Sequence, residues 1–171
     1  MNPFLALRAQ AAAKRDEANP AHLEAAIESM MTLNRHAAHI VREVGVHALT
    51  DVTGFGILGH GYEIAAASGV ALQFEAPRLP LLPGALDYAA RGVTNAGAGR
   101  NQEYADGRIV ISADVPPELR QVLYDPQTSG GLLFAIAPDR AAQTERLFAE
   151  ANLPVWRVGT AVEGTSVSVV A

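Results

Sequence analysis

Apolar residues recur at helical spacing along much of the chain. After Asn19-Pro20 they form a stripe with a period of about 3.6 residues, made of Leu23, Ala26, Ile27, Met30, Met31, Ala37, Ala38 and Val41. The stripe predicts one helix from Pro20 to about Glu43, ended at Gly45, with both methionines in the core. The same reasoning predicts further helices over residues 1–19, 57–68, 85–90, 117–123 and 138–152.

Shorter apolar runs, bounded by turn-forming residues, predict strands. These runs are residues 44–49, 70–74, 108–113, 132–137, 155–162 and 165–170. The last two flank Glu163-Gly164 and are predicted to form a hairpin. Residues 93–106 contain scattered glycines and are predicted to be a loop. Because helices and strands alternate but the chain closes in a hairpin, the predicted fold class is α/β (α+β), a layered mixed β-sheet flanked by helices.

Composition narrows the class of protein. The 171 residues predict one domain, and 49% apolar with 18% charged residues is ordinary for a globular protein. The net charge of −5 gives no basic surface for nucleic acid, and the absence of cysteine excludes disulfides and thiolate chemistry. No apolar run approaches the ~20 residues of a membrane span, and the first residues make a poor signal peptide. We therefore expect a cytoplasmic protein with no membrane or nucleic-acid partner.

The stretch from His47 to Ile64 carries the clearest chemical pattern. A predicted strand leads into Thr50-Asp51-Val52-Thr53, and three glycines follow before an amphipathic helix. Strand, glycine-rich turn and helix together favour anion binding, because the helix start offers unpaired N–H groups and the turn allows close approach. Asp51, at the tip of the strand, is placed to hold a hard cation against that anion.

Two interpretations of the glycines stay open at this point. Gly54, Gly56 and Gly59 fit G-x-G-x-x-G, and Glu75 lies about 20 residues further on, as a dinucleotide-binding unit requires. Alternatively, the glycines only shape a tight turn with a helix packed close behind it.

Other polar segments are candidates for the same site. Arg100 and Asn101 follow two glycines and predict either an anion contact or a flexible surface turn. Residues 125–131 (DPQTSGG) predict either a strand-entry loop capped by Asp125, or a rim that touches phosphate or metal-bound water. The rim would use Thr128, Ser129 and the Gly130 amide. His60 is predicted to have a capping or packing role, with acid–base chemistry as the alternative. Asn34 is predicted to be a capping or core-edge amide.

Several phrases of the chain resemble selenophosphate synthetase (selenide, water dikinase). They occur in the family's order at about its spacing, and they are residues 50–60 (TDVTGFGILGH), 125–133 (DPQTSGGLL), 31–35 (MTLNR) and 82–85 (LPGA). The wider family includes aminoimidazole ribonucleotide synthetase, which shares only the Thr-Asp and Ser-Gly-Gly elements. The resemblance predicts a helical leader over residues 1–18 and a synthetase-type C-terminal domain over residues 19–171.

The resemblance implies an activity of a complete enzyme, in which ATP, selenide and water give selenophosphate, AMP and phosphate. It implies Mg²⁺ and ATP as cofactors, with Asp51 as a metal ligand. The implied nucleotide-binding residues are Gly54, Gly56, Arg100, Asn101, Thr128, Ser129 and Gly130.

Family enzymes also have an N-terminal domain with a reactive Cys or selenocysteine, a nearby Lys and most nucleotide contacts. This chain has no Cys, and its only lysine, Lys14, lies in the leader. We therefore assign no catalytic residue and expect the chain alone to lack activity until an N-terminal domain is supplied in cis or in trans. The alternatives are a stand-alone anion- or nucleotide-binding regulatory module, or a relative from the purine pathway.

Overall fold

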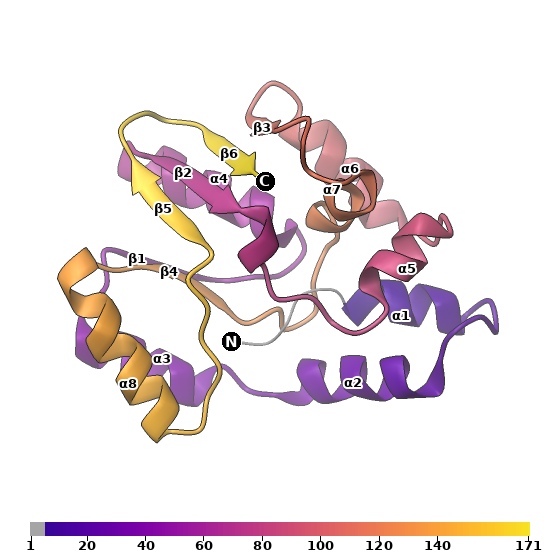
Figure 1. The fold of residues 1–171 in the computed structure, drawn as a ribbon, viewed down its shortest axis with the longest axis horizontal. Helices are drawn as coiled ribbons and strands as arrows, with labels where there is room; N and C mark the ends of the chain where they lie inside the picture. Colours follow the sequence, from indigo (N-terminus) through magenta and orange to yellow (C-terminus); the bar gives the residue numbers. More distant parts are fainter. Residues whose placement is uncertain (1–5) are drawn as a thin grey trace.

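The computed structural model describes residues 6–171 of the chain, with side chains from Arg8 onward. It is a layered α/β structure in which helices cover two small β-sheets (Figure 1), so the predicted fold class is confirmed. The helices are α1 (Ala6–Ala13), α2 (Pro20–Met31), α3 (Arg35–Val44), α4 (Gly56–Ser68), α5 (Ala85–Ala90), α6 (Ala96–Ala105), α7 (Pro117–Leu123) and α8 (Ala141–Glu150). The strands are β1 (Ala48–Asp51), β2 (Ala71–Glu75), β3 (Ile109–Ile111), β4 (Leu132–Ala135), β5 (Gly159–Val162) and β6 (Val167–Val170). Short 3₁₀ turns are η1 (Ala76–Arg78) and η2 (Pro138–Arg140).

The larger sheet has the strand order β3-β6-β2-β5. Strand β6 runs parallel to both β2 and β3, and β5 runs antiparallel to β2. The predicted hairpin of β5 and β6 is therefore wrong, because β2 lies between the two strands. Leu72 and Phe74 of β2 are buried. Strands β6 and β5 flank β2, so both edges of this apolar strand are covered.

The smaller sheet pairs β1 with β4 in antiparallel register, with Asp51 opposite Leu132. Because β1 lies in this sheet and β2 in the other, the glycine-rich turn does not join two neighbouring parallel strands. A dinucleotide-binding unit requires such a pair, so that interpretation of the glycines is wrong. Glu75, its proposed acidic partner, forms an ion pair with Arg78 instead.

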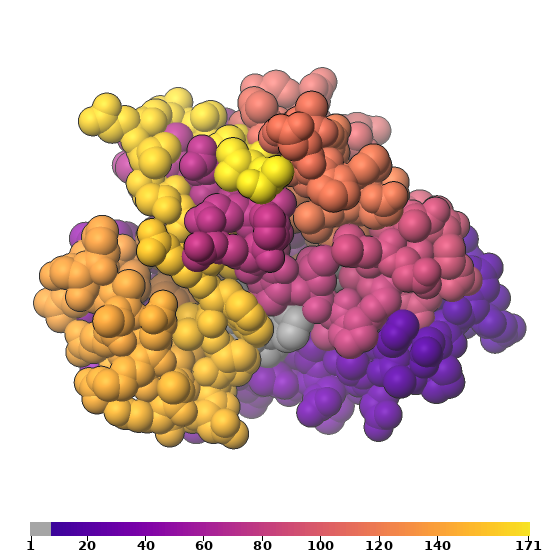
Figure 2. Space-filling view, viewed as in Figure 1, coloured from indigo at the N-terminus to yellow at the C-terminus, as the bar shows by residue number. Residues whose placement is uncertain are grey.

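Apolar residues gather in one main core and two smaller clusters. Helix α4 lies behind the larger sheet in Figure 1 and packs on β1, β2 and β6, so that Leu58, Phe74 and Val167 are buried together. A second cluster joins α1 and α2 to α5, and a third joins α3 and α8 to β4. Figure 2 shows these outlying groups at opposite lower corners of the molecule, α8 on the left and α1 with α2 on the right.

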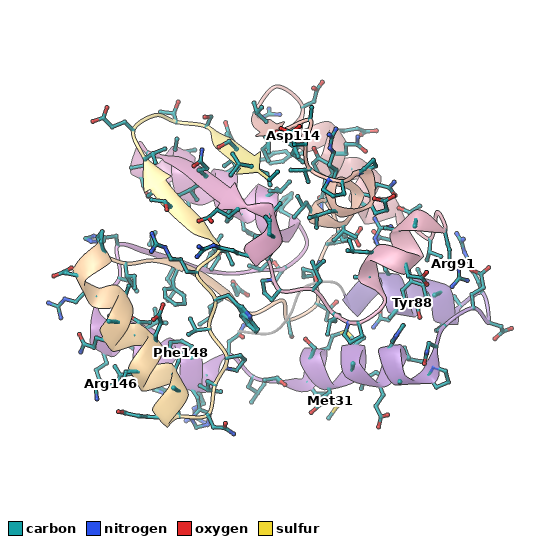
Figure 3. All side chains as sticks on the ribbon, viewed as in Figure 1. Met31, Tyr88, Arg91, Asp114, Arg146 and Phe148 are labelled. Atoms are coloured by element: carbon teal, nitrogen blue, oxygen red, sulfur yellow. The ribbon has the colours of Figure 1, made fainter. Side chains whose placement is uncertain are left out.

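The long helix predicted from Pro20 to about Glu43 is wrong, because α2 ends at Met31 and α3 starts at Arg35. Thr32 between them is extended, and its hydroxyl donates to the Glu28 carbonyl, a local bond that competes with helix propagation. Asn34 occupies the N-cap position of α3 without a side-chain capping bond. Met31, predicted to be in the core, is 74% exposed at the end of α2 (Figure 3).

The loop predicted over residues 93–106 is also wrong, because it contains α6. Glycines at positions 97 and 99 have low helix propensity, but Asn95 starts the helix by accepting a hydrogen bond from the Ala98 N–H at 2.9 Å. A Cβ atom at Gly97 would lie 2.6 Å from Cγ of Pro126. Glycine is therefore needed where α6 packs against the 125–131 segment.

Several boundaries shift by a few residues. Strand β1 begins at Ala48 rather than at residue 44, and η2 precedes α8. Of the helix predicted over residues 1–19, residues 6–13 are helical, while residues 1–5 lie outside the described part. The predicted C-cap of α4 is confirmed, since Gly69 is left-handed with φ of 65°. Among the residues described, no helix is both long enough and apolar enough to cross a membrane.

Candidate functional site

The two polar motifs of the sequence meet at the end of the smaller sheet. Beyond Asp51, the Val52 N–H donates to the Gly131 carbonyl, and the Gly130 N–H donates to the Val52 carbonyl, both at 2.9 Å. The Thr53 carbonyl then accepts from the N–H groups of Gly56 and Gln127, also at 2.9 Å. Residues 51–56 and 127–131 are therefore one hydrogen-bonded unit.

Asp51 presents a free carboxylate beside this unit. Val52 is fully buried, and side chains alternate along an extended chain, so Asp51 and Thr53 point away from the core side that Val52 occupies. The Asp51 side chain is exposed, and it forms no ion pair or hydrogen bond with the residues that the structure describes. A carboxylate in this position is available to a cation or to a donor from another chain segment.

The glycine-rich turn is shaped by Gly56 rather than by Gly54. Gly56 is left-handed, with φ of 65°, and a Cβ atom there would lie 2.6 Å from the Asp125 carbonyl oxygen. A Cβ atom at Gly54 would meet nothing within 4 Å. The N–H of Gly56 already donates to Thr53, which competes with its predicted contact to a phosphate. Gly56 thus allows the turn and the 125–131 segment to touch.

A polar chain runs from this turn along α4. His60 is buried, with its Nε2 atom 3.2 Å from Oγ1 of Thr53 and its Nδ1 atom 2.8 Å from Oε2 of Glu63. The Phe55 ring meets the His60 ring edge-on, with the ring centres 5.8 Å apart. These contacts give His60 two polar partners and fix the Thr53 hydroxyl on the side of Asp51. They match the packing role that the sequence predicts for His60.

Asp125 is held by a partner that the sequence analysis missed. The Arg8 guanidinium donates to both carboxylate oxygens of Asp125, at 2.5 Å from Nε and 3.0 Å from Nη2. Arg8 also donates to the carbonyls of Val93 and Gln121, so all of its nitrogens are used. Burial raises the pKa of the Asp125 carboxyl to about 6, while the hydrogen bonds and charge of Arg8 oppose that rise.

The Arg8–Asp125 pair ties α1 to the loop that carries the Thr128 and Ser129 side chains. Both charged side chains are almost completely buried. The strand-entry-loop interpretation gives Asp125 a capping role, but its carboxylate is used in the ion pair instead. The only signal for Arg8 is that it is the one charged residue between Ala6 and Ala13, in a predicted helix that is mostly apolar.

Arg100 and Asn101 both lie on α6, beside the glycine-rich turn. The Asn101 side chain is buried, and its amide nitrogen donates to the carbonyls of Gly54 and Tyr124, each at 2.9 Å. The tie keeps Asn101 next to the turn. Arg100 is exposed and forms no ion pair with the described residues, so its charge is available to an anion.

Burial also shifts the pKa of the hydroxyl of Tyr124, which directly precedes Asp125 in the chain. Its pKa is raised by burial, lowered in part by the Arg120 charge and raised again by Asp106.

The predicted rim residues lie on the surface edge of the same unit. Thr128 is exposed, and Ser129 is left-handed with φ of 56°. A Cβ atom at Gly130 would lie 2.7 Å from Cβ of Gln127 and 2.8 Å from the Val52 oxygen, so the crossing of the two motifs requires glycine. The Gly130 N–H is already bonded to Val52, so the exposed Thr128 side chain is the better contact for a ligand.

The site offers an incomplete set of metal ligands. Within residues 6–171, no group of three or more His, Asp or Glu side chains is placed to hold a metal ion. Mg²⁺ takes octahedral oxygen ligands and usually keeps waters and substrate phosphates among them. Asp51 fits one such ligand position, and the remaining ligands would be water, phosphate or groups of another domain.

Comparison with known proteins assigns the family. Residues 2–171 match the model of the AIR synthase related protein, C-terminal domain, and the chain belongs to this family. It is similar to two curated proteins named selenide, water dikinase. The one from Rhizobium meliloti (strain 1021) is 41% identical over 157 residues, which is 91% of this chain and 45% of that protein. The one from Caldanaerobacter subterraneus subsp. tengcongensis is 43% identical over 121 residues, which is 71% of this chain and 35% of that protein.

The solved structures that resemble the chain share its fold at low sequence identity. Thiamine-monophosphate kinase from Stenotrophomonas maltophilia K279a has a TM-score of 0.66 at 20% identity, and the match covers 98% of this chain and 48% of that one. AaThiL complexed with AMPPCP and TMP has a TM-score of 0.57 at 18% identity, covering 98% of this chain and 45% of that one. The chain thus spans less than half of the length of these relatives.

Proposed function

We propose that this chain serves as the C-terminal domain of a selenophosphate synthetase and closes the phosphate and magnesium end of its active site. The observation that carries the proposal is the exposed, unpaired Asp51 carboxylate at the junction of the two motifs. The names of the similar curated proteins support the selenium branch of the family over the purine branch.

In the proposed enzyme, ATP, selenide and water give selenophosphate, AMP and phosphate. Bound Mg²⁺ would spread the charge that develops during phosphoryl transfer. Asp51 would supply one carboxylate ligand to that ion. Arg100 and the hydroxyls of Thr128 and Ser129 would contact phosphate oxygens. Gly54, Gly56 and Gly130 would allow the phosphates to approach the backbone closely, and Asn101 would hold the glycine-rich turn in place. AMPPCP, named with the AaThiL structure, supports the use of an ATP-like nucleotide by this fold.

The proposal includes a second domain. Asp51 alone provides too few ligands for Mg²⁺, and the unit around it faces outward. An N-terminal domain, in cis or in trans, would cover this face and bring the reactive groups and most nucleotide contacts. We also propose that the complete enzyme is located in the cytoplasm, as expected from the sequence.

Substitution of Asp51 tests the metal assignment. In an enzyme that combines this chain with the N-terminal domain of the Rhizobium meliloti relative, Asp51→Asn should lower AMP formation by about 100-fold or more, because it removes a charged ligand where charge develops. The thermal midpoint should be unchanged, since the side chain is exposed and has no described partner. Asp139→Asn, another exposed carboxylate, is the matched control and should keep full activity. Wild-type AMP formation by Asp51→Asn would rule out the metal assignment.

A further inference from the structure

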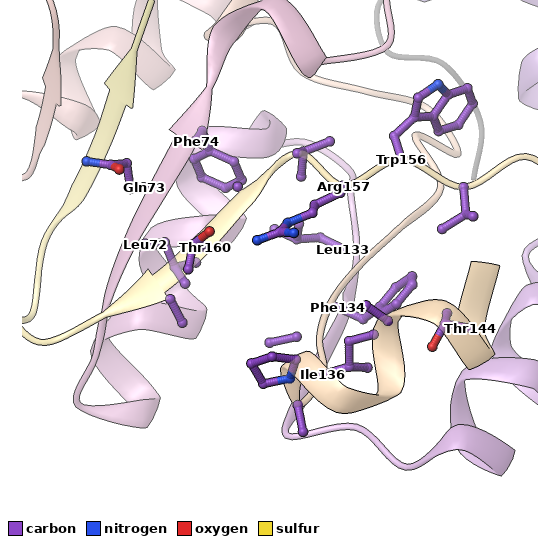
Figure 4. Close-up of a pocket in the computed structure, with 18 of the residues that line it drawn as sticks. Leu72, Gln73, Phe74, Leu133, Phe134, Ile136, Thr144, Trp156, Arg157 and Thr160 are labelled. Atoms are coloured by element: carbon purple, nitrogen blue, oxygen red, sulfur yellow. The ribbon is translucent and has the colours of Figure 1, made fainter.

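A cavity of about 300 Å³ lies at the seam between the two sheets, and none of the residues that line it falls within residues 51–56 or 127–131. One wall is formed by β2 and β5, the opposite wall by β4 and the residues after it, and α8 lies along the side (Figure 4). Strand β5 is the outermost strand of its sheet, so no further strand covers the cavity on that side. The volume lies at the lower end of the range for small-molecule sites.

The lining of this cavity is mostly apolar and includes three aromatic side chains. Phe74 of β2 and Leu133 and Phe134 of β4 belong to or pack against the main core, while Trp156 precedes β5 and is only partly buried. Such a lining favours a ligand with an apolar body, because burial of apolar surface is worth about 25 cal/mol per Å².

Arg157 supplies a charge at the mouth of the cavity. Its side chain extends into the middle of the view in Figure 4, with Leu133 and Phe74 around it. Arg157 is exposed, and among the described residues no carboxylate pairs with it. An arginine fork at an apolar cavity matches the planar geometry of a carboxylate.

Glu145 of α8 also lines the cavity and is exposed. Its negative charge opposes a dianion such as a phosphate monoester, because like charges in a partly enclosed site repel. A single negative charge is therefore the better match for Arg157.

We propose that this cavity binds a small amphipathic monocarboxylic acid, with the aromatic or aliphatic body between the two sheets and the carboxylate on Arg157. None of the lining residues belongs to the site around Asp51, so the proposal stands independently of the proposed enzyme activity.

The intrinsic fluorescence of the purified chain tests this proposal directly. Trp156 is the only tryptophan and lines the cavity, so its emission reports occupancy. Titration with 3-phenylpropanoate should give a saturable change in emission, and 3-phenylpropanamide should bind more weakly. Arg157→Gln should weaken binding of the acid by about tenfold and leave that of the amide unchanged, since only the charged contact is lost.

Two further variants separate the cavity from the surface. Ala141→Leu places extra side-chain volume in the cavity and should abolish binding of both compounds, with folding checked by circular dichroism. Arg146→Gln, on the outer side of α8 (Figure 3), removes an arginine that does not line the cavity and should bind as the wild type does. The proposal is overturned by the absence of any saturable change in the wild type, or by equal affinity of the wild type and Arg157→Gln for the acid.

Discussion

Replacement of Arg8 by Met is expected to destabilise the chain by about 3–5 kcal/mol, measured as the free energy of unfolding in urea at pH 8. The substitution keeps an unbranched side chain but leaves the buried Asp125 carboxylate without its ion-pair partner. It also removes the donors to the Val93 and Gln121 carbonyls. The 125–131 segment should loosen with it, because Arg8 is the contact that joins this segment to α1.

The pH dependence gives this prediction a sign. Burial raises the folded-state pKa of the Asp125 carboxyl to about 6, above its pKa in the unfolded chain. The free energy of unfolding therefore falls as the pH rises from the unfolded-state pKa through the folded-state pKa. Loss of Arg8 removes the opposing charge, so the deficit of the variant should grow between about pH 5 and about pH 8.

The control for Arg8 is Arg146→Met, which removes an arginine from an exposed pair with Glu150 on α8. That change should stay within about 0.5 kcal/mol of the wild type. An Arg8→Met variant within about 1 kcal/mol of the wild type at pH 8 would contradict the role given to the buried pair.

Substitution of Gly56 by Ala is expected to cost about 2–5 kcal/mol, combining the penalty of a left-handed alanine with the strain of an overpacked contact. The added Cβ atom would lie 2.6 Å from a backbone oxygen of Asp125, which cannot swing away as a side chain can. Relief of this contact requires the glycine-rich turn and the 125–131 segment to separate. The thermal midpoint of the purified chain measures the effect.

Gly54→Ala is the matched control, because it adds the same atom two residues away. Gly54 is not left-handed, and a Cβ atom there meets nothing within 4 Å. This variant should unfold within about 0.5 kcal/mol of the wild type. Equal destabilisation by both substitutions would show that the turn is sensitive to any side chain, and that the approach of Asp125 to Gly56 is not the cause.

Local signals in the sequence were enough to predict several elements. Helix α4 with its Gly69 cap, helices α5 and α7, and strand β2 follow from periodicity and capping residues. Strand order did not follow, since the pairing of β5 and β6 with β2 depends on which apolar strand the whole sheet buries. The break at Thr32 and the start of α6 at Asn95 are each accompanied by a local side-chain hydrogen bond, which periodicity does not register.

In the candidate site too, local motifs were predictable from the sequence and long-range contacts were not. The motifs around Asp51 and at residues 125–131 were recognised as chemistry from residue types, and the structure brings them together through Val52 and Thr53. Arg8 was missed because its partner Asp125 is 117 residues away in sequence, and the local pattern of α1 gives no sign of a long-range pair. The use of the Gly130 N–H group inside the protein could not be predicted without the register of β1 and β4, whereas the Gly56 N–H makes a local turn bond to Thr53.

Selenide-dependent formation of AMP from ATP tests whether this chain works as the C-terminal domain of a selenophosphate synthetase. It should be measured with the purified chain alone, and with the chain fused to the N-terminal domain of the Rhizobium meliloti relative. We expect no turnover by the chain alone, because one aspartate cannot hold the metals and phosphates within the about 3–3.5 Å that reacting groups require. We expect turnover by the fusion. Turnover by the chain alone, or a folded fusion with no selenide-dependent AMP formation, would contradict the proposed function.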